Sequence, residues 1–460
     1  MSADPLLILQ MQRMGDLLLT FPLLLDLQKL WPEHPIWVVA EEMFFRPLLP
    51  FSPKVTFFPP AMLKSLSSTH FAKVINLSFR PEATQAMASF SAEKKLGAVQ
   101  DASGLHIHGF WQLYRHSLTQ NNRHNTLHWA DLNRLDITTL KDLPCKKHLP
   151  GPAKGRRLGL VLGASNDLKH PDLPFWISLT RALIRDGYLP FFFGGAREKE
   201  LGEHLARAVS LPKANFCGRL SLREVAQWFS SLALCISPDT GPMHLADWLG
   251  VPVLNLSMGP VRAHETGPYS PGQLVLMPQM SCAGCWECAR GIRCKKKFQP
   301  LAVLRTVNRF FAAQDFQTQD IRRLRLWQST QLNGLYCLRP FLQDEPNAQR
   351  ALDAFMRELF FAFYEPAHFA HLHAPCASLQ QHFPALSKVL ETRLKAMLSQ
   401  ALTGLKKQQS TPDFLRHEPP CLRLLAGFLE MYLENANSSR SAWQTVLGWL
   451  SQTLELFLSR

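Results

Sequence analysis

The chain has 460 residues, of which 46% are hydrophobic and 19% are charged. This length exceeds what one hydrophobic core supports, and this composition excludes an intrinsically disordered chain, so we expect two or three globular domains. The formal net charge of +14 is spread along the chain, which favours anionic ligands or an anionic membrane surface as partners and argues against a nucleic-acid-binding protein.

The first hundred residues alternate short apolar runs with helical segments. A helix is predicted over about 17–30, and strands are predicted at 6–12, 36–40, 54–58, 73–79 and 94–99. Strands separated by helices predict a parallel sheet with helices on both faces. Arg13 and Asp16 interrupt the apolar start, and no basic segment precedes it. We therefore expect no membrane-spanning helix and no secretory signal at this end of the chain. The expected location of the protein is the cytoplasm.

Residues 101–150 hold a cluster of imidazole and indole groups without a clear period. Its members are His106, His108, His116, His124 and His128, interleaved with Trp111 and Trp129. These groups suit an acceptor-binding surface, a metal cluster or simple surface composition. The sequence leaves these three interpretations open.

A second α/β pattern begins after a segment rich in Pro and Gly at 144–155. A helix is predicted over 174–187, and strands are predicted at 156–163, 187–195, 233–237 and 252–258. Sixteen of the 24 glycines lie in 151–300, and glycines gather where the backbone turns sharply or approaches a ligand. We therefore expect the second pattern to bind the nucleotide.

The junction after the predicted strand 233–237 gathers groups that bind anions and sugars. Its residues run Asp239-Thr240-Gly241-Pro242-Met243-His244. Ligands of open parallel sheets lie outside the carboxyl ends of the strands, and the start of the next helix favours a phosphate. Gly241 lets a phosphate reach the backbone, and Thr240 and His244 offer donors. A helix capped by Thr240 beside a partly buried histidine explains the same residues.

Four segments in chain order resemble glycosyltransferase family 9, the ADP-heptose:lipopolysaccharide heptosyltransferases. They are QRMGDLLLTFPLL (12–24), LGASNDLKHPDLPFW (162–176), FFFGGAREKE (191–200) with GRLSLREVAQWFSSLALCIS (218–237), and SPDTGPMHLADWLGVPVLNL (237–256). The resemblance covers roughly residues 1–290 and implies an α/β protein of GT-B architecture, with two Rossmann-like domains facing each other across a cleft. We assign 1–150 to the acceptor side, 151–280 to nucleotide-sugar binding, 281–299 to a Cys-rich linker and 300–460 to a mostly helical extension.

The resemblance also implies an inverting transfer of a heptose or related sugar from an ADP-sugar to a lipopolysaccharide core acceptor, with no cofactor for catalysis. Asp16 matches the general base. The donor-binding positions are Ser165 and Lys169 at the diphosphate, Glu198 at the ribose, Leu220 near the adenine, and Asp239, Thr240, Gly241 and His244 in the loop after the strand. Two alternatives stay open: a protein acceptor for the same donor, or an inactive scaffold that binds a partner through its tail.

Some positions depart from the family pattern or have simpler explanations. Ser165 replaces a usual Thr, and Asp247 and Trp248 stand where Ala is common, which leaves the donor sugar open. Capping of the following helix is an alternative explanation for Asp16, and an exposed surface position is an alternative explanation for Lys169.

Four cysteines lie close together, with the spacing C-x2-C-x2-C-x5-C. They are Cys282, Cys285, Cys288 and Cys294. Four thiolates can close a tetrahedral structural site for Zn or Fe, without an open position for substrate. Inherited core cysteines without a metal are the alternative. The helical tail that follows offers no chemistry of its own, and covering the first domain, binding a partner or lying on the inner membrane are all compatible with it.

Overall fold

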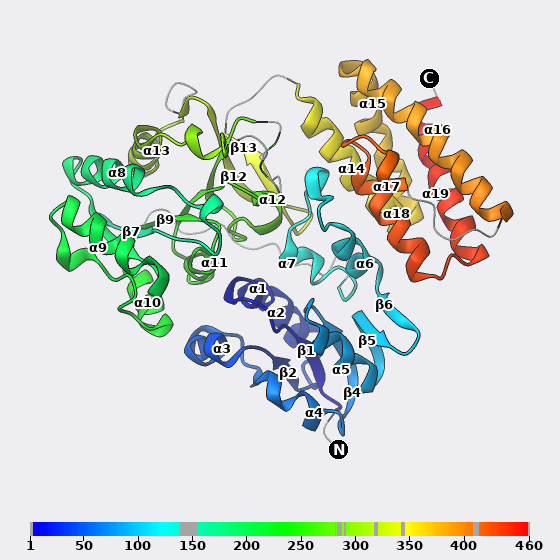
Figure 1. Cartoon of the computed structure of the whole chain (residues 1–460), viewed down its shortest axis with the longest axis horizontal. Helices are drawn as coiled ribbons and strands as arrows, with labels where there is room; N and C mark the ends of the chain where they lie inside the picture. Colours follow the sequence, from blue (N-terminus) through cyan, green and yellow to red (C-terminus); the bar gives the residue numbers. More distant parts are fainter. Residues whose placement is uncertain are drawn as a thin grey trace. The chain divides into compact units, whose positions relative to one another are not determined.

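The computed structural model of the chain describes residues 3–138, 155–280, 282, 288, 291–316, 321–341, 346–407 and 414–458. The chain divides into two compact units, each built from two separate segments (Figure 1). Unit 1 comprises Met1–Lys95 and His128–Gln343, and unit 2 comprises Leu96–Leu127 and Asp344–Arg460. The predicted domain boundary near residue 150 falls outside the described residues.

The first half of unit 1 is a parallel sheet with helices between its strands. The strand order is β3-β2-β1-β4, with Leu6 opposite both Ile36 and Lys73. Its elements are β1 (Leu6–Leu9), α1 (Met14–Leu18), α2 (Phe21–Leu30), β2 (Ile36–Val39), α3 (Glu42–Leu48), β3 (Thr56–Phe58), α4 (Leu63–Leu66), β4 (His70–Asn76) and α5 (Pro81–Ser89). The helix predicted over 17–30 is two helices, because Pro22 lacks an N–H and lies in the first turn of α2.

The predicted strand 94–99 is part of an antiparallel hairpin. β5 (Ser91–Asp101) leads from unit 1 into unit 2 and pairs with β6 (Gly104–His108), with Gly97 opposite His108. The predicted strand is thus present within β5, and its partner β6 runs antiparallel to it.

The second half of unit 1 is a seven-stranded sheet of order β13-β12-β11-β10-β9-β7-β8. Its strands are β7 (Arg157–Val161), β8 (Leu189–Phe193), β9 (Leu234–Pro238), β10 (Val253–Leu256), β11 (Leu274–Pro278), β12 (Leu324–Leu332) and β13 (Leu335–Pro340). The first five are parallel, and a single bridge between Phe192 and Asn215 stands beyond β8. This order is that of a Rossmann sheet whose third strand is reduced to one bridge.

Helices lie between these strands in sequence and pack on the seven-stranded sheet to form a hydrophobic core. They are α7 (Trp129–Leu132), α8 (Leu173–Arg185), α9 (Lys199–Ala208), α10 (Leu222–Phe229), α11 (Gly241–Trp248), α12 (Ala263–Thr266) and α13 (Pro300–Ala312). Trp176, Leu254 and Val303 are buried in this core, so α8 and α13 cover the sheet.

The β12–β13 hairpin lies in a segment that we predicted to be helical. Asn333 and Gly334 join the strands, and both have positive φ, at 52° and 76°. An Asn-Gly pair with this conformation is the typical two-residue hairpin turn. Within 300–460 the hairpin therefore separates α13 from the run of helices that begins at α14 (Ala348–Tyr364).

Unit 2 is helical apart from the β5–β6 hairpin. Its helices are α6 (Phe110–Ser117), α14, α15 (His373–His382), α16 (Pro384–Lys407), α17 (Phe414–His417), α18 (Arg423–Asn435) and α19 (Arg440–Leu458), with a 3-10 helix at Pro366–Leu372. Aromatic rings fill the core of unit 2. The ring centroids of Trp111 and Phe361 are 4.8 Å apart, and those of Tyr114 and Phe360 are 4.5 Å apart. Among the described residues, no helix is long and apolar enough to cross a membrane.

Candidate functional site

The residues that the sequence singled out lie at the carboxyl ends of parallel strands in unit 1. They are Asp16 after β1, Ser165 and Lys169 after β7, Glu198 after β8, and Asp239 to His244 after β9. β7 and β9 are neighbours although β8 lies between them in sequence. At such a reversal of strand order the loops diverge and leave room for a ligand.

His244 is buried beside carboxylates and has an unpaired ring nitrogen. Its side chain is 6% exposed, and its Nε2 lies 3.9 Å from Asp239 Oδ1. Burial lowers the pKa of His244 and outweighs the opposing charges of Asp239, Asp247 and Asp16. Nδ1 of His244 has no hydrogen-bond partner among the residues that the structure describes. The ring is therefore neutral at pH 7 and keeps one nitrogen for a ligand.

Asp239 is oriented by a residue that the sequence analysis missed. Its side chain is buried, and its Oδ2 accepts a hydrogen bond from the Thr266 hydroxyl at the end of α12. The other carboxylate oxygen faces His244. Thr266 lies 27 residues away in sequence, and only the pairing of β9 with β10 brings α12 to this position.

Thr240 occupies the N-cap position of α11, as in the simpler explanation, but its side chain makes no capping hydrogen bond. The side chain is partly exposed, and the helix start leaves backbone N–H groups that favour an anion.

Two glycines let α1 and α11 meet. A Cβ on Gly241 would lie 2.4 Å from Met14 Cε and 3.6 Å from the Gly15 nitrogen. A Cβ on Gly15 would lie 3.1 Å from His244 Cδ2. The absence of both side chains thus places the loop after β1 directly against the loop after β9.

Asp16 lies in the first turn of α1 and is partly exposed. Its Oδ2 accepts a hydrogen bond of 3.3 Å from the Arg13 backbone N–H, as expected of a residue that caps a helix. Its charge also acts on His244. The position therefore combines the capping role with a carboxylate beside the loop after β9.

The loop after β7 brings positive charge to the same region. Lys169 ends a 3-10 helix at Asp167–Lys169, and its charge acts on His244. Ser165 is exposed in this loop. Lys295 donates to the Asp167 carbonyl at 3.3 Å, which joins the basic segment after the cysteines to the loop.

Glu198 lies over the glycines that end β7 and β8. Its Oε2 accepts a hydrogen bond of 2.7 Å from Gly195 N, and a Cβ on Gly163 would lie 2.3 Å from its Cγ. An acid after the second strand is where Rossmann sheets hold a ribose. Leu220, predicted near the adenine, is partly buried just before α10.

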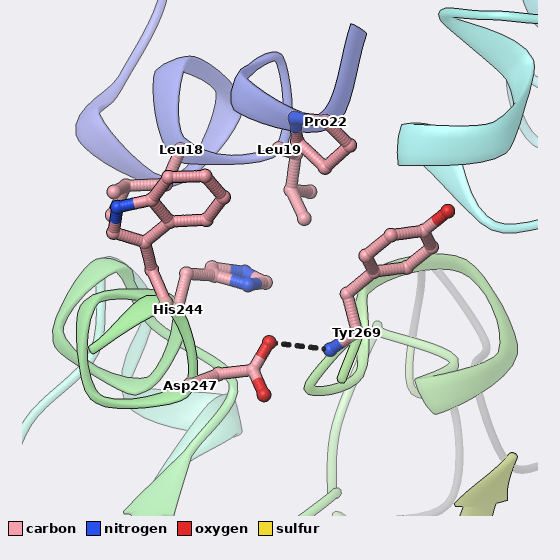
Figure 2. Close-up of a pocket in the computed structure, with 7 residues that line it drawn as sticks. Leu18, Leu19, Pro22, His244, Asp247 and Tyr269 are labelled. Carbon is pink, nitrogen blue, oxygen red and sulfur yellow. Dashed lines mark hydrogen bonds between the residues drawn. The ribbon is translucent and has the colours of Figure 1, made fainter. Parts of the chain in front are cut away.

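A small pocket lies where the two halves of unit 1 meet (Figure 2). Leu18, Leu19 and Pro22 line it from the first half. His244, Asp247, Trp248 and Tyr269 line it from the second half. Figure 2 shows the His244 ring pointing into this pocket, between Leu19 and Tyr269.

Asp247 and Trp248, which depart from the family pattern, have structural roles here. Asp247 accepts hydrogen bonds from Tyr269 N at 2.8 Å, Ser270 N at 3.1 Å and Gln273 Nε2 at 2.7 Å. Trp248 Nε1 donates to the Phe51 carbonyl at 2.7 Å. The first residue holds the loop that carries Tyr269, and the second connects α11 to the first half.

A buried network behind Tyr269 was not predicted. The Tyr269 hydroxyl donates to Asp131 at 2.6 Å and accepts from Arg134 at 2.7 Å, and Arg134 also donates to Asp26 at 2.5 Å. Burial and the adjacent Asp131 raise the pKa of Tyr269 well above its usual value. Asp26 belongs to α2, so this network ties the first half to the second.

The cluster of histidines and tryptophans is not one site. His128 belongs to unit 1, and its Nε2 donates to the Gly267 carbonyl at 3.0 Å. The other four histidines belong to unit 2, where His124 pairs with Asp353 at 2.7 Å and His116 Nδ1 lies 2.8 Å from the Gln112 carbonyl. Within the described ranges, these five do not form one group of metal ligands. The partners of these three histidines are structural, and the described residues lend the metal-cluster interpretation no support.

Of the four cysteines predicted to hold a metal, Cys285 lies outside the described residues. Cys282, Cys288 and Cys294 are partly exposed thiols. Cys288 Sγ accepts a hydrogen bond from Ile292 N at 3.1 Å, and such bonds are common around metal-bound thiolates. A metal ion at the four cysteines stays a prediction.

Residues 140–291 match the family model described as glycosyltransferase family 9 (heptosyltransferase). This match covers about a third of the chain. Lipopolysaccharide heptosyltransferase 1 of Pseudomonas aeruginosa is 35% identical over 120 residues, which are 25% of this chain and 32% of that protein. Lipooligosaccharide heptosyltransferase 2 of Haemophilus influenzae is 28% identical over 99 residues, which are 21% and 28% of the two chains. The chain thus spans a third or less of the length of these relatives.

The two Rossmann-like sheets of unit 1 have the expected fold. The solved structure of ADP-heptose LPS heptosyltransferase II of E. coli superposes with a TM-score of 0.51 at 19% identity, over 67% of this chain and 99% of that chain. This likeness confirms the GT-B fold class predicted for the two Rossmann-like sheets. Asp16, Lys169, Glu198 and the loop after β9 all lie at the same ends of these sheets.

Proposed function

We propose that the chain is an inverting glycosyltransferase that moves a heptose or related sugar from an ADP-sugar to a lipopolysaccharide core acceptor. The observation that carries this proposal is the convergence of Asp16, Lys169 and the buried His244 around the start of α11. The match of residues 140–291 to the family 9 model and the heptosyltransferase relatives support the choice of donor.

The proposed reaction is a single displacement. The acceptor hydroxyl oxygen attacks the anomeric carbon, the bond from that carbon to the diphosphate oxygen breaks, and ADP leaves with the electron pair. Asp16 accepts the hydroxyl proton as the new bond forms, and a positioned base of this kind contributes about 10²–10⁴-fold to the rate.

The charge that grows on the departing ADP meets fixed positive groups. Lys169 supplies a full charge, and the N–H groups at the start of α11 supply partial charges. His244 is neutral at pH 7, so in this proposal it donates or accepts one hydrogen bond and adds no charge. Glu198 accepts from the ribose hydroxyls, and Leu220 packs near the adenine. No catalytic metal is needed in this scheme.

We further propose that the reaction takes place in the cytoplasm, at the inner face of the inner membrane where the acceptor lies. Incubating the purified protein with ADP-heptose and a heptose-free lipopolysaccharide core tests the activity. ADP release together with a mass gain of one heptose on the acceptor is expected. Transfer to a polypeptide alone would replace the proposed acceptor, and the absence of release with every acceptor would favour the scaffold alternative.

We also propose that the four cysteines hold a structural Zn or Fe ion, with all four positions filled by sulfur. This ion would fix the segment that carries Lys295 onto the loop after β7. Elemental analysis with thiol titration of the folded protein tests it. Four freely titratable thiols and less than about a tenth of an equivalent of metal would leave the cysteines without this role.

A further inference from the structure

Unit 2 contains two histidines on one face of a short 3-10 helix. The helix runs Pro366–Leu372, and its residues three apart lie directly above one another, because 3-10 helices have three residues per turn. His368 and His371 obey this spacing. Their rings stack at 4.3 Å between centroids, with only 11° between their planes.

A carboxylate from a different helix completes the group. Glu358 lies on α14, and its Oε2 is 2.6 Å from Nε2 of His368. Ligand atoms of Glu358, His368 and His371 all lie within 4.8 Å of one another. Phe361, one turn further along α14, packs its ring 5.5 Å from that of His368 and limits the movement of the imidazole.

We propose that Glu358, His368 and His371 form a binding site for a divalent first-row metal ion, with Zn²⁺ as the best-matched ion. Two imidazole nitrogens and one carboxylate oxygen are a ligand set that Zn²⁺ accepts, and bonds of about 2.0–2.2 Å place its ligands roughly 3.4 Å apart. The three ligand atoms, which lie within 4.8 Å of one another, would close to this spacing around the ion. The ion takes the place of the proton that His368 shares with Glu358, and water fills the remaining position because His371 is exposed.

Burial distinguishes this group from the other candidate among the described residues. Asp4, His70 and Glu93 also lie within 4.8 Å of one another, but all three are exposed. In the proposed site the Glu358 and His368 side chains are only 27% and 18% exposed, and their hydrogen bond already holds them in place. Less side-chain freedom is therefore lost when the ion binds.

The site is in unit 2, whereas the donor-binding residues are in unit 1. We therefore assign it a structural role: it joins the last turns of α14 to the 3-10 helix that follows. The proposal does not depend on the glycosyltransferase activity.

Equilibrium dialysis of the chelator-stripped full chain against Co²⁺ tests the proposal, because thiolate-bound Co²⁺ has an intense near-ultraviolet charge-transfer band that imidazole and carboxylate ligands lack. We expect one equivalent bound without that band, in addition to any metal on the cysteines. His371→Ala should remove this equivalent or weaken it at least about tenfold. Glu358→Gln keeps the shape of the side chain, removes the anionic ligand, and should have the same effect.

His373→Ala is the matched control, because His373 is an exposed histidine two residues further on. It should bind as the wild type does, and all variants keep the cysteines. Circular dichroism confirms that each variant is folded. Equal Co²⁺ binding by the wild type, His371→Ala and Glu358→Gln would overturn the proposal, as would an equal loss in His373→Ala.

Discussion

Asp16 can be tested apart from donor binding, because its carboxylate also caps α1. Asp16→Asn keeps an oxygen that can accept the Arg13 N–H, but an amide cannot take a proton from the acceptor. We expect turnover to fall by at least about 10²-fold while ADP affinity is unchanged. Steady-state rates and calorimetry measure the two effects. Asp4→Asn, at an exposed carboxylate, is the control, and wild-type turnover in Asp16→Asn would remove Asp16 from the mechanism.

Lys169 is expected to act on ADP through its charge. Lys169→Met keeps the length of the side chain and removes the ammonium group. A hydrogen bond to a charged group contributes about 1.5–3 kcal/mol, so the Kd for ADP should rise roughly 10- to 100-fold. Calorimetry at two salt concentrations measures this loss. Lys213→Met, at an exposed lysine between α9 and α10, serves as the control; unchanged affinity in Lys169→Met would show that the diphosphate lies elsewhere.

At the scale of elements, Asp247 connects α11 to the loop that carries Tyr269. Its carboxylate accepts from two backbone N–H groups and one side-chain amide. Asp247→Asn replaces one acceptor with an NH₂ group that faces donors. We expect the free energy of unfolding of unit 1 to fall by about 1–3 kcal/mol in urea titrations, and hydrogen exchange at residues 269–273 to become faster. An unfolding curve identical to that of the wild type would show that the hydrogen bonds of Asp247 to this loop do not stabilise unit 1.

Helix α6 contains a histidine that should make unit 2 sensitive to acid. Burial and the adjacent Arg115 lower the pKa of His116 to about 4. In the unfolded chain His116 takes up a proton near pH 6.5, but in the folded chain only near pH 4, so unfolding becomes more favourable as the pH falls between these values.

The expected loss of unfolding free energy on this account is about 2 kcal/mol between pH 7 and pH 4.5. His116→Gln removes this titration, so its unfolding free energy should depend less on pH than that of the wild type. Urea unfolding of both proteins at the two pH values measures the difference. Parallel pH profiles would show that His116 is protonated normally in the folded state.

At the scale of the whole molecule, unit 2 is assembled from an internal and a terminal segment. Deleting 344–460 would remove Phe360 and Phe361 from the rings of Tyr114 and Trp111, both of which are almost fully buried. We expect that variant to aggregate, because α6 would expose its aromatic face. Light scattering and near-ultraviolet circular dichroism measure this outcome.

Replacing 96–127 by a Gly/Ser linker in the same deletion variant is the matched test. Unit 1 then loses both segments of unit 2 together, and we expect a monomer that still binds ADP. A monomeric, well-packed protein after the terminal deletion alone would show that residues 96–127 do not depend on the terminal segment.

The local pattern of the chain was sufficient for most of unit 1. Apolar runs between helical segments predicted β1 to β4 and β7 to β10, and the helical extension predicted over 300–460 contains α14 to α19. These signals are local because helix and strand periodicities span only a few residues. The Asn333-Gly334 turn was an equally local signal, and reading it would have revealed the β12–β13 hairpin.

The order of strands and the composition of the units depended on distant contacts. Residues 96–127 carry no mark of their pairing with the terminal helices, because buried aromatic faces do not specify which partner covers them. Likewise, nothing in the sequence around Thr266 indicates that its hydroxyl donates to Asp239, because this contact depends on where the fold places α12.

By itself, the sequence determined the fold class and the family 9 resemblance, because a loop that binds a nucleotide sugar keeps its residue types within one short segment. It also named the residues that follow β1, β7, β8 and β9. The tertiary structure decided that these loops meet, through the close approach of Gly15 and Gly241. It also decided that His244 is neutral, because desolvation depends on the chain segments that cover a side chain, and these are distant in sequence.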